Sequence, residues 1–265
     1  MEGMLLLPLD AFKLSVYILL SYKELYMNIM TNYSELTCEV ARACKNCGRN
    51  TGDVKILSVS KTVGIEEINL AKSAGATMFG ENRIDVLGPK FQLHPEYHWH
   101  FIGNIQSRKI SEIVKCSELI HSVHKIEHLK KIDKVAKEEN KIQNILIECN
   151  TSGELSKSGV SEQGLEDMIL ECMNLDNISV QGLMTMAPIV GSAKVDGDLS
   201  KVYSQNDVKE CFKNLALLKS KMHDRYKGEF KEEFLSELSM GMSKDWKIAI
   251  ECGSTIIRVG SAIFN

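Results

Sequence analysis

Eight short apolar segments alternate with longer, mostly amphipathic segments from Val54 to the end of the chain. Short apolar runs are typical of buried strands, and apolar residues three and four positions apart are typical of helices. We predict strands at residues 54–60, 77–80, 98–102, 119–123, 144–149, 179–184, 234–238 and 255–259, and helices at residues 65–74, 126–139, 162–173, 206–223 and 245–251.

This alternation restricts the chain to two α/β architectures. One is an open doubly wound sheet, and the other is a closed (β/α)8 barrel of the TIM type. Eight strand-then-helix units favour closure, and no G-x-G-x-x-G motif follows the first strand to indicate a dinucleotide-binding sheet. We therefore predict a single TIM-type barrel over residues 31–265, a length usual for this fold.

Residues 1–30 are predicted to form an N-terminal extension outside the barrel. The stretch from Met4 to Leu20 is apolar, but Pro8, Asp10 and Lys13 interrupt it, so it is too short and too broken for a stable membrane span. It lacks a charged leader followed by a small-residue cleavage site, which disfavours a secretory signal. We expect a dispensable extension, and a targeting or membrane-touching segment is the alternative.

Charge and cysteine content exclude several classes of function. The formal net charge is −3 and no sustained basic run is present, so nucleic-acid binding is not expected. The eight cysteines are scattered apart from Cys44 and Cys47, and no second ligand pair follows this C-x-x-C at the spacing of a zinc site. We expect reduced thiols, a cytoplasmic location and no metal.

A lysine stands at the carboxyl end of the first predicted strand, where a TIM-type barrel holds its site. Lys61 directly follows residues 54–60. An amine half withdrawn from water at this position favours its neutral form, because burial penalises the ammonium ion. A neutral lysine forms Schiff bases with aldehydes such as pyridoxal phosphate (PLP). The alternative is a strand-end lysine that points to solvent.

The seventh and eighth strands contribute groups suited to a phosphate and to a ring. Residues 239–243 and the pair Gly260-Ser261 offer backbone N–H groups, hydroxyls and close approach, at the two strands where such barrels often hold phosphate. Arg258 precedes that pair. It either pairs with a carboxylate or lies near a pyridine ring, where its fixed charge disfavours protonation of the ring nitrogen.

Seven motifs, in one order along the chain, resemble those of the pyridoxal phosphate homeostasis proteins, whose fold resembles the barrel of bacterial alanine racemases. The resemblance runs from around Asn32 to the C-terminus. The motifs are SVSKT (58–62), FGEN (79–82), WHFIGNIQS (99–107), KSGV (157–160), GLMTMAP (182–188), LSMGMS (238–243) and RVGSA (258–262).

The resemblance implies PLP as the cofactor and assigns a role to seven residues. Lys61 would carry PLP as a Schiff base, Arg258 would face the pyridine nitrogen, and Asn82 would lie beside the ring. The phosphate would be held by Ser239, Met240, Gly260 and Ser261.

Two functions from different classes fit such a site, a PLP carrier and an amino-acid racemase. Racemisation needs acid–base groups on both faces of the substrate, and Lys61 serves one face. Racemases take the opposing tyrosine from a further C-terminal domain; none is expected after Asn265, and no tyrosine here, Tyr203 included, has an obvious rim position. We expect a non-enzymatic, monomeric PLP-binding protein that serves intracellular PLP homeostasis, with PLP-dependent apoenzymes as partners. The racemase is the alternative.

Overall fold

The computed structural model describes residues 9–154, 157–193, 202–230 and 233–265, with side chains from Tyr26 onward. Its centre is a closed barrel in which each parallel strand pairs with the next one along the chain. β1 also pairs with β8, with Ile56 opposite Ile257, and this pairing closes the barrel. The strands are β1 (Lys55–Val59), β2 (Met78–Glu81), β3 (His98–Phe101), β4 (Leu119–Val123), β5 (Gln143–Glu148), β6 (Ile178–Met184), β7 (Glu237–Ser239) and β8 (Ile256–Val259).

The closed barrel confirms the predicted TIM-type fold, and the alternative of an open doubly wound sheet is wrong. Each strand overlaps a predicted strand. β7 differs most from its prediction, because it begins at Glu237 rather than at residue 234. Leu235 has a φ of +51°, which lies outside the strand region, so the chain turns there before it enters the barrel.

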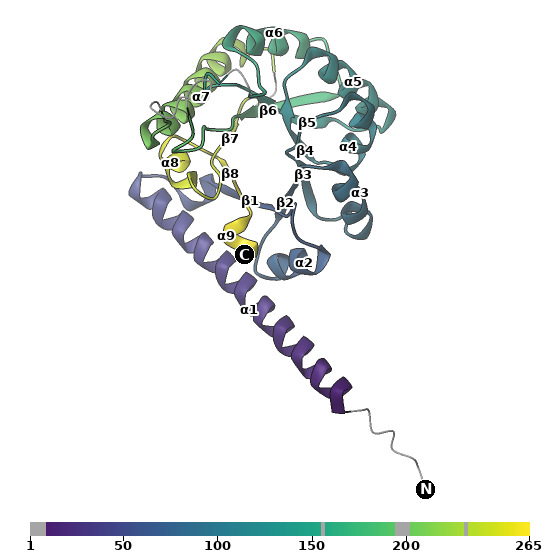
Figure 1. Ribbon diagram of the computed structural model, residues 1–265. Coiled ribbons are helices and arrows are strands. Elements are labelled where there is room, and N and C mark those ends of the chain that lie inside the picture. The colour runs from purple at the N-terminus through teal and green to yellow at the C-terminus, as the bar shows by residue number, and fades with distance from the viewer. Residues whose placement is uncertain (1–8, 155–156, 194–201, 231–232) are drawn as a thin grey trace.

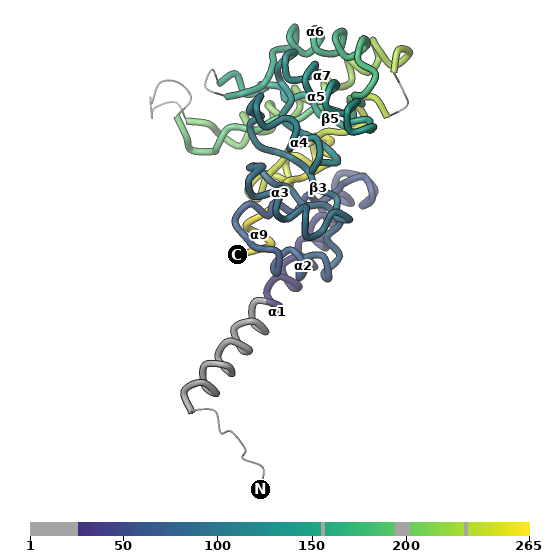
Figure 2. The backbone as a smooth tube through the Cα atoms, turned by 90° about the vertical axis from the view of Figure 1, so that its right-hand side faces the viewer, coloured from purple at the N-terminus to yellow at the C-terminus, as the bar shows by residue number. Residues whose placement is uncertain are grey.

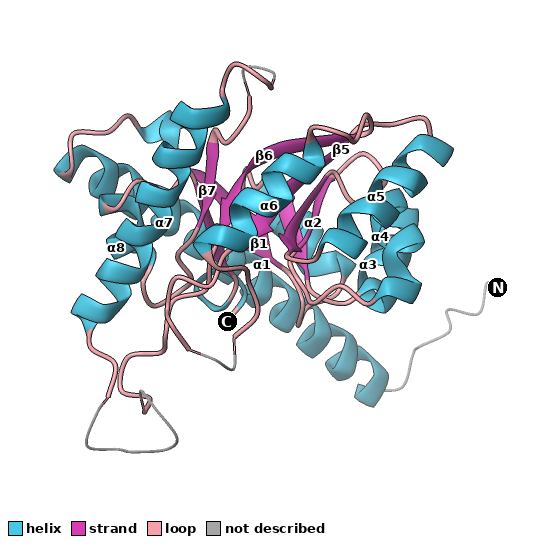
Figure 3. Ribbon diagram, turned by 90° about the horizontal axis from the view of Figure 1, so that it is seen from above, coloured by secondary structure: helices cyan, strands magenta, loops and turns pink. Residues whose placement is uncertain are grey.

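Helices surround the strands and cover the outer face of the barrel (Figure 1, Figure 3). They are α2 (Ile65–Ser73), α3 (Ile84–Leu93), α4 (Ile110–Cys116), α5 (Ile126–Glu138), α6 (Glu162–Cys172), α7 (Gln205–Tyr226), α8 (Trp246–Glu251) and α9 (Ser261–Phe264). The predicted helices correspond to α2, α5, α6, α7 and α8. α3 was missed because Gly88 and Pro89 have poor helix propensity, but burial of Ile84 and Leu87 stabilises it.

A long helix, α1 (Leu9–Asn46), precedes the barrel and packs beside α2, α8 and α9 (Figure 1). Figure 2 shows α1 next to α2 and α9 from another side. The predicted boundary between residues 30 and 31 falls inside this helix. Ile29, on the N-terminal side of that boundary, is 1% exposed and belongs to the core. Among the residues that the structure describes, no helix is both long enough and apolar enough to cross a bilayer. The buried residues of α1 recur at the three- and four-residue spacing of one helical face: Ile29, Tyr33, Leu36, Val40 and Cys44.

The interior of the barrel combines a small apolar layer with a set of polar side chains. The apolar layer contains Leu57, Leu119, Leu146, Met184 and Ile256. The polar set is buried and hydrogen-bonded from one member to the next, and it comprises His100, His121, Ser239 and Arg258. A TIM-type barrel presents its site at the C-terminal ends of its strands, so these polar groups lie beneath any site formed there.

Candidate cofactor site

A cavity of about 490 Å³ opens at the C-terminal ends of the strands. Five of the seven predicted site residues line it, namely Lys61, Asn82, Arg258, Gly260 and Ser261. The barrel therefore brings together residues from opposite ends of the fold's sequence, with Lys61 directly after β1 and Arg258 in β8. The other lining residues are Val59, Thr62, Ile102, Gly103, Asn104, Met184, Met186, Met242, Ser243 and Asn265.

Lys61 lies on the rim of this cavity. β1 ends at Val59, and Lys61 occupies the turn that follows Ser60. Its side chain is exposed, and among the described residues no hydrogen bond or ion pair holds its Nζ. The expectation that this amine is half withdrawn from water is therefore wrong for this structure, because the turn lifts it beyond the strand end. Its amine is accessible to a ligand in the cavity.

A buried ion pair supports the turn that carries Lys61. Lys90 Nζ lies 2.6 Å from Glu81 Oε1 and donates to the carbonyl oxygen of Ser60 at 2.9 Å. Ser60 Oγ donates to the same Glu81 oxygen at 2.6 Å. The side chain of Glu81 is fully buried, and that of Lys90 is 9% exposed. This network joins the ends of β1 and β2 to α3, directly beside Lys61 and Asn82.

Asn82 follows β2 and is held in place by the close approach of another loop. The backbone of Gly103, after β3, packs on the Asn82 carbonyl so tightly that a Cβ at position 103 would lie 1.9 Å from the carbonyl oxygen. The Asn82 side chain is exposed at the mouth of the cavity. Only glycine at position 103 permits this approach without displacement of Asn82.

Arg258 forms part of the cavity floor although it is only 5% exposed. Its Nη1 donates to Ser239 Oγ at 2.7 Å, and its Nη2 donates to the Thr185 carbonyl oxygen at 2.9 Å. Burial lowers the pKa of this guanidinium to about 10, while Asp245 and Glu148 act in the opposite direction. No carboxylate forms an ion pair with it among the described residues, so the structural salt-bridge alternative lacks a partner there. Donors remain on the guanidinium for an acceptor in the cavity.

The loops after β7 and β8 form a polar pocket on one side of the cavity. Ser243 Oγ and Ser261 Oγ lie 3.0 Å apart. Gly260 is the N-cap of α9, and a Cβ there would lie 2.8 Å from the Val59 carbonyl oxygen. The Met242 amide is not available to a ligand, because it donates to Asp245 Oδ1 at 2.5 Å. Two hydroxyls and the amides of a helix start suit the oxygens of a phosphate.

Two predicted phosphate ligands, Ser239 and Met240, do not line the cavity. Both are fully buried. Ser239 is the last residue of β7 and bonds to Arg258 and His121 inside the barrel, and the Met240 amide donates to the Ile256 carbonyl oxygen. The residues of this motif that reach the cavity are Met242 and Ser243, which follow Gly241 with its φ of +94°. Within this motif the lining residues come from the loop after β7, whereas the roles assigned from the resemblance fell on Ser239, the last residue of the strand, and on Met240 directly after it.

The acid–base groups around the cavity are few. Among its described lining residues, Lys61 and Arg258 are the only ones with an ionisable side chain. Tyr203 is buried elsewhere, and the pair of His124 Nδ1 and Glu148 Oε2, 3.2 Å apart, lies outside the lining. All eight cysteines are free, and within the described parts of the chain no cluster of side chains forms a metal site.

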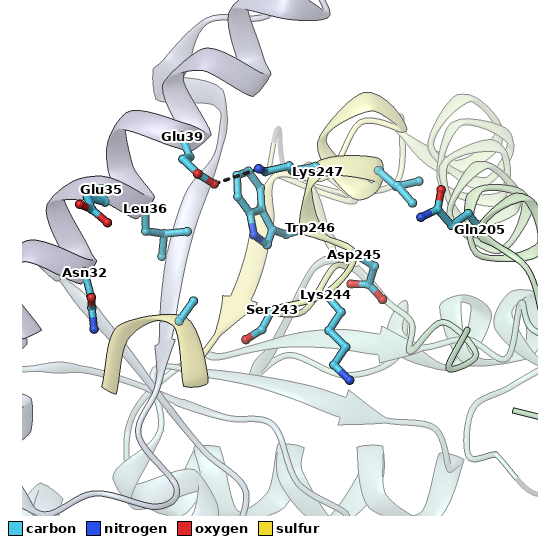
Figure 4. A pocket seen from close by; sticks show the side chains of 12 residues that line it. Asn32, Glu35, Leu36, Glu39, Gln205, Ser243, Lys244, Asp245, Trp246 and Lys247 are labelled. Carbon is cyan, nitrogen blue, oxygen red and sulfur yellow. Dashed lines mark ion pairs between the residues drawn. The ribbon is translucent and has the colours of Figure 1, made fainter. Parts of the chain in front are cut away.

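A second cavity, of about 500 Å³, lies between α1 and the loop that leads into α8 (Figure 4). Glu39 and Lys247 form an ion pair of 3.0 Å across it, beside the indole of Trp246. It shares Ser243 with the first cavity but contains none of the seven predicted site residues. Of these two cavities, only the first is lined by residues of the predicted site.

Comparison with known proteins first defines the class of this barrel. Residues 38–265 match the family described as "Alanine racemase, N-terminal domain". An alanine racemase of Clostridium difficile shares the fold, with a TM-score of 0.64 at 15% identity over 86% of this chain and 56% of that chain. The chain is thus a barrel of the alanine racemase N-terminal type.

Relatives of similar length define a narrower family. The chain is 32% identical over 241 residues to the pyridoxal phosphate homeostasis protein of Aquifex aeolicus (90% of this chain, 98% of that protein). It is 34% identical over 244 residues to that of Vibrio alginolyticus (90% and 97%). PipY of Synechococcus elongatus, solved with PLP bound, has a TM-score of 0.69 at 26% identity (80% and 93%). The chain belongs to the pyridoxal phosphate homeostasis protein family.

Proposed function

We propose that this protein binds PLP in the cavity at the barrel mouth and holds it without catalytic turnover. The observation that carries this proposal is the composition of the cavity lining. It combines one accessible lysine, a buried arginine with spare donors and a pocket of two hydroxyls, and it has no second acid–base side chain opposite Lys61 among the described residues.

Each part of this lining fits one part of PLP. The Lys61 amine would form a C=N bond with the aldehyde carbon, with loss of one water, to give a Schiff base. Arg258 would donate to the ring nitrogen, and Asn82 would lie beside the ring. Ser243, Gly260 and Ser261 would hold the phosphate, and Ser243 takes the place in this set that the sequence had indicated for Ser239 and Met240.

The absence of turnover follows from what Arg258 and the lining do. A guanidinium at the ring nitrogen disfavours protonation of that nitrogen, which weakens the ring as an electron sink. Proton transfer on both faces of an amino acid needs two bases, and the described lining contains only Lys61 in a suitable role. The names of the relatives, homeostasis proteins rather than racemases, support the same interpretation.

The setting of this function is also proposed. Eight free cysteines fit a reducing, cytoplasmic compartment. A protein that keeps the reactive aldehyde bound would buffer free PLP and supply it to PLP-dependent apoenzymes. We propose a monomer, because one chain contains every residue of the site.

The visible absorption spectrum of the purified protein tests the proposal, before and after borohydride, followed by mass spectrometry of its peptides. We expect a yellow protein that loses its colour on reduction and carries a phosphopyridoxyl group on Lys61. Lys61→Arg is the matched control, since it keeps the charge but cannot form the Schiff base. A protein that stays colourless with added PLP contradicts the proposal.

A racemase assay separates the carrier from the enzyme. We expect no racemisation of alanine or serine above background in the PLP-loaded protein. Robust turnover that disappears in Lys61→Ala would contradict the carrier function and support the racemase.

A further inference from the structure

Four polar side chains form a continuous hydrogen-bonded chain across the interior of the barrel, from β8 to β3. Arg258 Nη1 lies 2.7 Å from Ser239 Oγ, and Ser239 Oγ lies 2.9 Å from His121 Nδ1. His121 Nε2 lies 2.9 Å from His100 Nδ1. All four residues are at most 5% exposed. We refer to Arg258, Ser239, His121 and His100 as the interior chain.

The guanidinium of Arg258, together with the need of each buried polar atom for a partner, gives a direction to every bond in the interior chain. A guanidinium only donates, so Ser239 Oγ accepts from Arg258. A buried hydroxyl needs an acceptor for its single proton, and among the described residues His121 Nδ1 is the one acceptor bonded to Ser239 Oγ, so Ser239 donates to His121. His121 is consequently the neutral tautomer with its proton on Nε2. It donates that proton to His100 Nδ1, so His100 also carries its proton on Nε2.

We propose that Ser239 and His121 are positioning residues that fix the Arg258 guanidinium, rather than ligands of a phosphate. The Thr185 carbonyl oxygen holds Nη2 at 2.9 Å, and Ser239 holds Nη1, so the planar group is clamped at two corners. Its remaining donors are left for the cavity, toward the ring nitrogen. This inference rests on the proposed function only for the identity of that ring.

The hydroxyl of Ser239 is committed on both sides, which leaves no proton for a phosphate oxygen. Each removal of a partner would leave a buried polar group without a hydrogen bond, the costly case in a protein interior. Because the members come from β3, β4, β7 and β8, the interior chain connects the orientation of Arg258 to the opposite wall of the barrel.

Nitrogen NMR of the histidine side chains tests the interior chain without any cofactor. In the free protein we expect the spectrum of His100 and His121 to show protonated Nε2 and unprotonated Nδ1 at neutral pH. In Ser239→Ala, His121 loses the donor to its Nδ1, and we expect its signals to shift. A protonated Nδ1 on His121 in the native protein would mean that His121 donates to Ser239, and this reversed hydrogen bond would overturn the proposal.

Binding of two small probes separates positioning from phosphate contact. Pyridoxine 5′-phosphate has the ring and the phosphate but no aldehyde, whereas inorganic phosphate has neither ring nor aldehyde. For Ser239→Ala we expect the Kd for pyridoxine 5′-phosphate to rise about ten-fold, as is typical for loss of a hydrogen bond to a charged group, and the Kd for inorganic phosphate to stay unchanged. Equal weakening of both probes would identify Ser239 as a phosphate ligand and overturn the proposal.

Ser254→Ala provides the matched control. Ser254 is also fully buried and lies beside β7 and β8. Its Oγ donates to backbone carbonyl oxygens, among them that of Met240 at 2.7 Å, and it does not hydrogen-bond to Arg258. We expect no change in either Kd for this variant; a ten-fold loss for pyridoxine 5′-phosphate here too would reduce Ser239 to a general structural role. If the native protein binds neither probe, the proposed function fails, while the tautomers of His121 and His100 still decide the interior chain.

Discussion

At the scale of single residues, Lys61, the lysine proposed to carry PLP, has few contacts with the rest of the fold. It is exposed and, in the described part of the chain, has no partner for its Nζ. We predict that Lys61→Ala changes the free energy of unfolding by no more than about 0.5 kcal/mol, as is usual for exposed positions without special contacts. Urea denaturation followed by circular dichroism measures this. An unfolded variant would mean that Lys61 is packed rather than free on the rim.

Arg258 has the opposite character, since Nη1 and Nη2 of its guanidinium each donate to a buried partner. Loss of a donor leaves both Ser239 Oγ and the Thr185 carbonyl oxygen short of a bond. We predict that Arg258→Leu lowers the free energy of unfolding by about 2 kcal/mol or more. We also expect this variant to bind pyridoxine 5′-phosphate more weakly. Thermal denaturation and the same binding titration measure the two effects. A variant as stable as the native protein would show that these two contacts carry no net stability.

At the scale of elements, the junction of β1, β2 and α3 depends on one buried ion pair. Glu81 is fully buried, and its Oε2 has no hydrogen-bond partner among the described residues. Within the same residues, Lys90 is the only cation that forms an ion pair with this carboxylate. We predict that Lys90→Met costs about 3–5 kcal/mol of stability, because it strands a buried carboxylate. The double variant Lys90→Met/Glu81→Gln should recover part of the loss in urea denaturation.

The exposed pair of Lys109 and Glu112 is the control for this prediction, at 3.1 Å and on the surface. Lys109→Met should change stability by less than about 1 kcal/mol, as surface pairs generally do. Equal costs for Lys90→Met and Lys109→Met would mean that burial of Glu81 has no energetic consequence.

The contact between the loops after β2 and β3 makes a second prediction at this scale. A Cβ at position 103 would lie 1.9 Å from the Asn82 carbonyl oxygen, so Gly103→Ala must displace Asn82 from the cavity. We predict that the Kd for PLP rises at least about ten-fold. Gly88→Ala in α3 is the matched control, because nothing lies within 4 Å of a Cβ there, and alanine favours a helix. Unchanged PLP binding in Gly103→Ala would show that Asn82 is not needed at the ring.

At the scale of the whole molecule, the local pattern of the sequence was sufficient for the barrel but not for the details of its site. The alternation of short apolar runs with helical segments and the residues after each strand are local properties, so the closed barrel and the positions of Lys61, Arg258, Gly260 and Ser261 at its mouth could be predicted. Asn82 was indicated by the family resemblance alone. The positive φ of Gly241 sends the following residues to the cavity, and no local pattern reveals that turn. The bond between His121 and Ser239 joins residues 118 positions apart, which only the closed barrel brings together.

The interior chain also gives the whole barrel a pH-dependent stability. Burial lowers the pKa of His100 to about 3, helped by the charges of His98 and Lys55. Burial, with His100 and Arg258, likewise lowers the pKa of His121. In the unfolded chain both imidazoles have ordinary pKa values of about 6.5. Below that pH the unfolded chain binds protons that the folded barrel does not bind.

The free energy of unfolding should therefore fall as the pH decreases from about 6.5 toward 5, by up to about 1.4 kcal/mol per pH unit for each of the two imidazoles. His128, whose pKa is also lowered, adds to this slope, whereas His124, whose pKa is raised by Glu148, opposes it. Urea denaturation at several pH values measures the slope. His100→Gln should reduce the slope by about one imidazole's share. Stability that is independent of pH across this window would mean that the two imidazoles accept protons inside the barrel, and the hydrogen bonds that hold Arg258 could not then run in the direction inferred above.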